Sequence, residues 1–149
     1  MPFVRSRTPA ALLLLALAGC PADQPLGPTA ELAPGRYALH SINGYTLPTT
    51  APCGVFRIVE GQVRLASGRL AEHHQRYVPI HGGKEVTYRG EGSFREVGDT
   101  AVVLTLTGRW SHTPESFTHK LHLRRTAQGL TRLVGMECDG ADVELYRMP

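Results

Sequence analysis

The feature that most constrains the fold is an alternation of apolar and polar residues that begins at Gly35. Successive side chains of a β-strand point to opposite faces, so this period of two predicts short strands with one buried face. Eight or nine segments carry the pattern. The residues predicted to share a face within each segment are Tyr37, Leu39 and Ser41; Phe56 and Ile58; Val63 and Leu65; Val86 and Tyr88; Val102, Leu104 and Leu106; Phe117, His119, Leu121 and Leu123; Leu130, Arg132, Val134 and Met136; and Val143 and Leu145.

Turn-forming dipeptides punctuate these segments at intervals of about 10–15 residues. They are Asn43-Gly44, Glu60-Gly61, Ser67-Gly68, Gly82-Gly83, Gly98-Asp99, Gln128-Gly129 and Asp139-Gly140. A short helix is plausible only over Leu70 to Gln75, because no other part of this region has an apolar stripe of helical period.

Strands at this spacing predict an all-β fold, an antiparallel up-and-down meander that closes into a barrel of about eight strands. Closure removes exposed sheet edges and makes the first and last strands neighbours. Gly90 and Gly92, inside one strand segment, are typical of a bend or bulge.

The first 20 residues have a different character from the rest of the chain. Arg5 and Arg7 precede an apolar run, Ala10–Ala18, which ends in Leu17-Ala18-Gly19-Cys20. A basic start, a short apolar core and small residues before a cleavage site are typical of a secretory signal. The run is about half the roughly 20 residues that a membrane-spanning helix needs.

This segment resembles a bacterial lipoprotein signal with its lipobox. The resemblance implies cleavage before Cys20 and lipidation of Cys20, which would anchor the protein to a membrane of the cell envelope. We expect the outer membrane, on its periplasmic side. Residues 1–19 would then be a cleaved signal peptide, residues 20–34 a lipidated Cys with a Pro-rich tether, and residues 35–149 the folded domain.

A second resemblance concerns the two ends of the domain. Gly35-Arg36-Tyr37-Ala38-Leu39-His40-Ser41-Ile42-Asn43-Gly44-Tyr45-Thr46-Leu47-Pro48 is similar to the opening of many small bacterial lipoproteins of unassigned function, and Val143-Glu144-Leu145-Tyr146-Arg147 is similar to their closing strand. The resemblance implies a lipocalin-like β-barrel. Its motifs are structural and bring no catalytic residue with them.

Two cysteines, Cys53 and Cys138, remain after Cys20 is assigned to lipid. In an oxidising envelope compartment an even pair predicts a disulfide, which would staple the seam between the first and last strands. Two separate buried thiols are the alternative.

Composition narrows the function classes. The formal charge falls from +3 to +1 once Arg5 and Arg7 are removed, and no basic block remains, so we expect no nucleic-acid partner. No nucleophile motif, phosphate loop or dinucleotide fingerprint is present, so we expect no enzyme activity, no catalytic residues and no cofactor. Seven histidines suggest a metal, but Glu72-His73-His74 would place its neighbours on opposite faces of a strand, so no metal site is predicted.

Four residues are candidates for a ligand site in the barrel: Tyr88, Trp110, His119 and Arg132. His119 and Arg132 interrupt apolar faces, so each is either a core residue satisfied by a partner or a polar group in a binding lumen. Arg132 in particular should have a partner or water, because an unpaired buried charge is costly. Tyr88 and Trp110 have the same two interpretations, core residue or ligand platform.

Two functions remain open. The first is binding of a small apolar or amphipathic ligand inside the barrel, since eight-stranded barrels either fill with side chains or hold one small ligand. The second is a protein-interaction module, an envelope assembly factor or an inhibitor of a periplasmic enzyme, acting through a loop such as Thr49–Gly54 or His112–Ser116.

Overall fold

The computed structural model describes residues 32–50, 55–136 and 140–149 as one antiparallel β-barrel. Eight strands form its wall, and β2 (Tyr45–Thr46), β3 (Thr49–Thr50) and a short 3-10 turn, η1 (Ser67–Arg69), complete the described elements. The wall strands are β1 (Gly35–Ile42), β4 (Phe56–Ala66), β5 (Leu70–Pro79), β6 (Val86–Val97), β7 (Ala101–Trp110), β8 (Phe117–Thr126), β9 (Gly129–Met136) and β10 (Gly140–Arg147).

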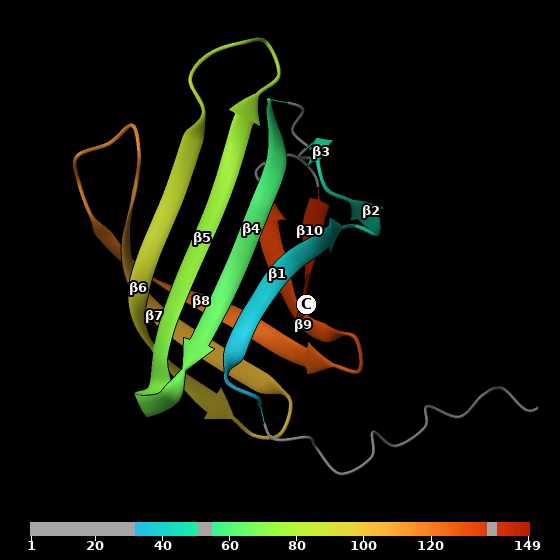
Figure 1. Cartoon of the computed structure of the whole chain (residues 1–149), viewed down its shortest axis with the longest axis vertical. Helices are drawn as coiled ribbons and strands as arrows, with labels where there is room; N and C mark the ends of the chain where they lie inside the picture. The colour runs from blue at the N-terminus through green and yellow to red at the C-terminus, as the bar shows by residue number, and fades with distance from the viewer. Residues whose placement is uncertain (1–31, 51–54, 137–139) are drawn as a thin grey trace, which may run out of the picture.

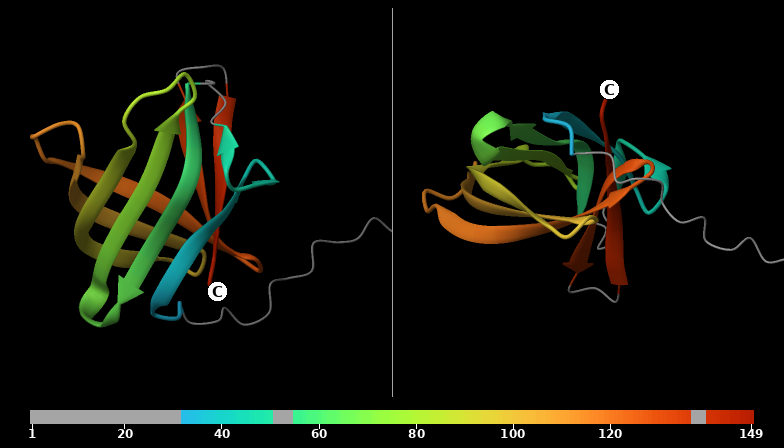
Figure 2. Two further views of the ribbon diagram at one scale, coloured as in Figure 1. Left: turned by 45° about the horizontal axis from the view of Figure 1, so that its top comes forward. Right: turned by 90° about the horizontal axis from the view of Figure 1, so that it is seen from below.

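The barrel closes through β1, which pairs with β10 on one side and with β4 on the other (Figures 1 and 2). From β4 to β10 every strand pairs with the next along the chain. The prediction of an up-and-down meander closing into about eight strands is therefore confirmed. Within residues 32–50, 55–136 and 140–149, no helix is long and apolar enough to cross a membrane.

Most of the predicted turns are present where the dipeptides indicated them. Asn43-Gly44, Ser67-Gly68, Gly82-Gly83 and Gly98-Asp99 lie between strands, Gln128-Gly129 lies where β9 begins, and each contains a residue with positive φ. Asp139-Gly140 lies partly outside the described residues.

The turn predicted at Glu60-Gly61 is wrong, because both residues lie inside the 11-residue strand β4. Gly61 is buried, and a Cβ placed on it would lie 2.8 Å from Cδ2 of Leu39. The glycine therefore serves the close packing of β1 against β4. The β4–β5 register has an irregularity beside this glycine, between Ile58 and Glu60.

The short helix considered for Leu70 to Gln75 is also wrong, because this segment is the first part of β5. Its neighbours β4 and β6 pair with it along most of its length. Within it His73 is buried and His74 is only half-buried, as expected for adjacent residues on opposite faces of a strand.

The last strand faces the opposite way from the prediction. Glu144 and Tyr146 are buried, at 3% and 0% exposure, whereas Val143 is 40% exposed. Val143 pairs with Leu133, which is 72% exposed, so this apolar pair lies on the outer surface of the barrel.

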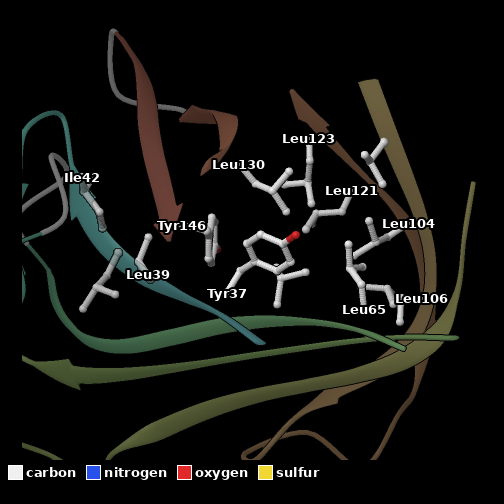
Figure 3. Packing of buried hydrophobic residues seen from close by; sticks show 14 residues of the cluster. Tyr37, Leu39, Ile42, Leu65, Leu104, Leu106, Leu121, Leu123, Leu130 and Tyr146 are labelled. Carbon is white, nitrogen blue, oxygen red and sulfur yellow. The ribbon is translucent and has the colours of Figure 1, made fainter. Parts of the chain in front are cut away.

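The two ends of the barrel differ. Aliphatic side chains from most of the wall strands fill one end, together with Tyr37 and Tyr146 (Figure 3). The fully buried residues there are Tyr146, Leu65, Leu104, Leu106, Leu121, Leu130, Val63 and Val102. This closed end also holds η1 and the start of β1, since Gly35 pairs with Leu65.

Candidate functional site

A cavity of about 310 Å³ occupies the other end of the barrel. Every wall strand from β4 to β10 contributes to its lining. The lining residues are Val55, Phe56, Ile58, His73, Gln75, Tyr77, Tyr88, Trp110, Phe117, His119, Arg132, Val134 and Glu144. A cavity of this size is at the low end of the range typical of small-molecule sites, roughly 300–1,000 Å³.

Aromatic rings form one wall of the cavity. The ring centroid of Tyr88 lies 5.2 Å from that of Trp110 and 5.9 Å from that of Phe117, and Tyr77 lies 5.5 Å from Trp110. These spacings are those of favourable tilted aromatic pairs, so the rings support one another as a continuous apolar surface.

Two glycines make room for the Tyr88 ring. A Cβ on Gly90 would lie 2.2 Å from the Tyr88 hydroxyl oxygen, and a Cβ on Gly108 would lie 2.4 Å from it. Gly90 pairs with Gly108 across β6 and β7, so the ring lies over a patch of bare backbone. The pairing of β6 with β5 and β7 runs without a register shift, so the bulge considered for Gly90 and Gly92 is absent. Gly90 is instead explained by the close approach of the Tyr88 ring to its backbone.

The floor of the cavity is polar and is organised around Glu144. Its Oε1 accepts a hydrogen bond from Gln75 Nε2 at 2.7 Å, and its Oε2 accepts from the Tyr146 hydroxyl at 2.8 Å and from Arg132 at 3.2 Å. The Tyr77 hydroxyl donates to Gln75 Oε1 at 2.5 Å. Burial and then the charge of Glu144 raise the pKa of Tyr77 and Tyr146, so both hydroxyls keep their protons at neutral pH.

Arg132 has the partner that its position in the sequence required. Its side chain is 20% exposed and forms an ion pair with Glu144, whose side chain is 4% exposed. Burial is the largest single influence on the pKa of Arg132 and lowers it, but attraction to Glu144, Tyr146 and Tyr77 together with the hydrogen bond to Glu144 outweighs burial, so the pKa is raised. Within the described residues the guanidinium donates only to Glu144, which leaves its other N–H groups available at the cavity.

His73 completes the network from β5. Its Nε2 lies 3.3 Å from the Tyr146 hydroxyl oxygen, and that hydroxyl already donates its single proton to Glu144. His73 must therefore carry its proton on Nε2 and donate it to Tyr146. Burial, followed by the charge of Arg132, lowers the pKa of His73 to about 3, so the imidazole is neutral at physiological pH.

This assignment leaves His73 Nδ1 as a bare acceptor. The atom is buried and has no hydrogen-bond partner among the described residues. An unpaired buried acceptor is uncommon in proteins, because it loses its hydrogen bond to water without replacement. His73 also lines the cavity.

His119 lies beside Tyr88 on the aromatic wall. The Tyr88 hydroxyl is 3.3 Å from His119 Nδ1, and the two rings meet edge to face at 5.4 Å. Burial and the charge of Arg132 lower the pKa of His119, which favours its neutral form. His119 and Arg132 therefore both have partners and also line the cavity.

All four ligand-site candidates from the sequence, Tyr88, Trp110, His119 and Arg132, line the same cavity. The sequence interpretation missed four polar contributors, which are His73, Gln75, Tyr77 and Glu144. A signal for Glu144 was present, since Arg132 on an inward face needs a partner for its charge. Cys20, Cys53 and Cys138 lie outside the described residues, so lipidation and the disulfide stay predictions.

The barrel wall is incomplete beside the cavity. The β8–β9 ladder has four pairs, from Thr126↔Gly129 to Leu123↔Arg132, and it does not continue toward the cavity end. Phe117 and His119 of β8 and Val134 of β9 line the cavity beyond the last pair. One edge of each strand is thus free of ladder hydrogen bonds along this stretch of the described barrel.

Within the described part of the chain, no three His, Cys, Asp or Glu side chains are arranged to hold a metal ion. Comparisons of the chain with protein-family models, with curated proteins and with solved structures found no match in any of the three.

Proposed function

We propose that this protein is an envelope lipoprotein, anchored through Cys20, whose lipocalin-like barrel binds a small, largely apolar molecule and catalyses no reaction. The cavity of about 310 Å³ carries this proposal, because aromatic rings line its wall while polar groups converge on its floor. An apolar pocket with a few precisely placed polar groups is the usual form of a small-molecule site.

The position of the cavity is compatible with an N-terminal lipid anchor. The chain enters the barrel at Gly35, at the closed end, and the cavity lies at the opposite end. A tether of residues 20–34, if extended at about 3 Å per residue, would leave the cavity end free on the periplasmic side of the outer membrane.

Trp110 offers a direct test, because it is the single tryptophan of the chain and lines the cavity. The full chain with Cys20→Ser, which carries no acyl chains, would be titrated with 2-methoxynaphthalene while Trp110 fluorescence is recorded. We expect a saturable change with one ligand per protein. Native mass spectrometry of the protein purified from envelopes should also detect a bound small molecule.

A matched pair of variants distinguishes the cavity from the outer surface. Val134 lines the cavity, whereas its neighbour Leu133 is 72% exposed. Val134→Phe should weaken binding by about tenfold or more by filling the cavity, and Leu133→Phe should leave it unchanged. Equal loss from both variants, or no saturable binding by the parent chain, would refute the proposal.

The free edges of β8 and β9 favour a second candidate, a protein-interaction module. Edges without ladder partners are templates for an added strand from another chain.

A pull-down from detergent-solubilised envelopes should then recover a stoichiometric protein partner, and Leu133→Lys should abolish recovery. Val97→Lys, at an exposed position of the closed end, is the control. An unaltered recovery with Leu133→Lys would count against this candidate.

A further inference from the structure

The hydrogen bonds of the cavity floor leave few options for the polar group of a ligand. Glu144 receives three hydrogen bonds, from Gln75, Tyr146 and Arg132, and Gln75 uses its amide group on Glu144 and on Tyr146, the latter at 3.2 Å. The Tyr146 hydroxyl donates to Glu144 and accepts from Gln75 and His73. Groups of the protein therefore fill three of the roughly four acceptor positions of Glu144 and saturate the Tyr146 hydroxyl.

His73 and Arg132, which both line the cavity, keep unused hydrogen-bonding capacity. His73 Nδ1 can accept one hydrogen bond, and no described residue supplies it. Arg132 retains N–H donors, since its hydrogen bond to Glu144 uses only part of the guanidinium. A hydroxyl group can satisfy both, because it donates one proton and accepts through its lone pairs.

The charges at the floor already cancel. Arg132 and Glu144 form an ion pair, and His73 is neutral. A charged ligand would bring a further charge next to groups that have no spare counter-charge, and it would lose its own hydration. A carboxylate would additionally face the lone pair of His73 Nδ1 with a lone pair of its own.

The size of the cavity sets the size of the apolar part. It has about twice the volume of the cavity of about 150 Å³ that takes up one benzene molecule. A fused pair of aromatic rings matches this volume, and the rings of Tyr88 and Trp110 provide flat surfaces for it.

From these features we infer that the ligand is an uncharged, bicyclic-sized aromatic molecule with a hydroxyl group, which donates to His73 Nδ1 and accepts from Arg132. The inference rests on the proposed ligand-binding function and adds the chemical class of the ligand. The site inferred in this way differs from a general apolar site, because it requires a hydrogen-bond donor on the ligand and disfavours ligands of either charge.

The test compares four naphthalenes of the same ring size on the Cys20→Ser chain at pH 7, with Trp110 fluorescence as the readout. 2-Naphthol carries the donor, 2-methoxynaphthalene lacks it, 2-naphthoate is an anion and 2-naphthylmethylammonium is a cation. We expect 2-naphthol to bind about tenfold more tightly than 2-methoxynaphthalene, as for one additional hydrogen bond, and both ions to bind more weakly than either.

His73→Phe provides the matched variant. It should reduce the preference for 2-naphthol over 2-methoxynaphthalene to less than about twofold, while the affinity for 2-methoxynaphthalene changes little. If this variant does not fold, the comparison of the four compounds on the parent chain still decides, because it needs no substitution at His73.

The outcomes separate this inference from the function beneath it. Equal binding of 2-naphthol and 2-methoxynaphthalene, or tightest binding of either ion, would overturn the inference and leave a ligand-binding barrel. Absence of saturable binding by all four compounds would overturn the proposed function as well.

Discussion

Glu144 shows how one residue can organise the polar part of an apolar barrel. It is 3% exposed and binds Gln75 of β5, Arg132 of β9 and Tyr146 of its own strand, β10. A buried carboxylate is tolerated only when its charge and lone pairs are satisfied, as they are here.

The Arg132–Glu144 pair leads to a prediction about stability. Glu144→Gln removes the counter-charge of Arg132 and should lower the free energy of unfolding by about 2–4 kcal/mol, somewhat less than for a fully dry pair because Arg132 is partly exposed. Urea unfolding would measure the loss. The double variant Arg132→Met, Glu144→Gln should recover much of it, and a double variant no more stable than the single one would contradict the account.

His73 leads to a prediction about pH. Its pKa is about 3 in the folded protein and 6.5 in the unfolded chain, so between these values only the unfolded chain takes up the proton. Stability from this residue is therefore complete above pH 6.5 and is lost as the pH falls toward 3. At pH 5 the loss amounts to about 2 kcal/mol, at about 1.4 kcal/mol per pH unit.

Urea unfolding at pH 7 and pH 5 tests this assignment when the parent chain is compared with His73→Gln. The amide of glutamine can still donate to Tyr146 but does not titrate. The parent should lose about 2 kcal/mol more than the variant between the two pH values. A variant with the same pH dependence as the parent would show that another group is responsible.

At the scale of the elements, the alternation along the chain identified most strands but misjudged two features that depend on neighbours. β4 continues through Glu60-Gly61 because a buried glycine lets Leu39 of β1 pack closely. In β10, Val143 points outward because Glu144 and Tyr146 occupy the inward face of the strand. In both cases contacts with other strands outweighed local propensity.

The contact of Tyr88 with Gly90 in β6 predicts a coupled pair of substitutions. Gly90→Ala would place its methyl group against the Tyr88 hydroxyl and ring, so it should cost about 1–3 kcal/mol of stability. In a Tyr88→Ala background the same change should cost less than about 1 kcal/mol. Thermal or urea unfolding of the four proteins gives the coupling energy. Additive effects would indicate that the alanine meets backbone rather than the tyrosine.

At the scale of the whole molecule, the barrel divides into a filled end and a hollow end. The filled end supplies the packed core, including Leu65, Leu104 and Tyr146. The fold is therefore stabilised there, while the other end holds an open cavity with polar groups. The pairing of β1 with both β4 and β10 holds these ends in one closed wall, although β8 and β9 part beside the cavity.

The disulfide between Cys53 and Cys138 is a prediction for the molecule as a whole. It would close a loop of about 85 residues and add about 4–5 kcal/mol of stability in the chain-entropy model. Alkylation of the unreduced protein followed by intact-mass measurement should find both thiols blocked. Free labelling of both thiols in the native protein would refute the bond.

The sequence by itself determined the class of fold, most strand positions and the inward direction of Tyr88, Trp110, His119 and Arg132. These follow from local rules, namely the period of two and the turn dipeptides. It also indicated that Arg132 needed a partner, without identifying Glu144.

Only the tertiary structure decided that these residues meet around one cavity and that Glu144, Gln75, His73 and Tyr146 form one network beneath it. The reason is physical: the face that a strand presents to the core depends on which residues oppose it across the barrel, and β5, β9 and β10 are far apart in sequence until the barrel closes. The period of two is local, whereas the balance of buried charges and hydrogen bonds belongs to the whole fold.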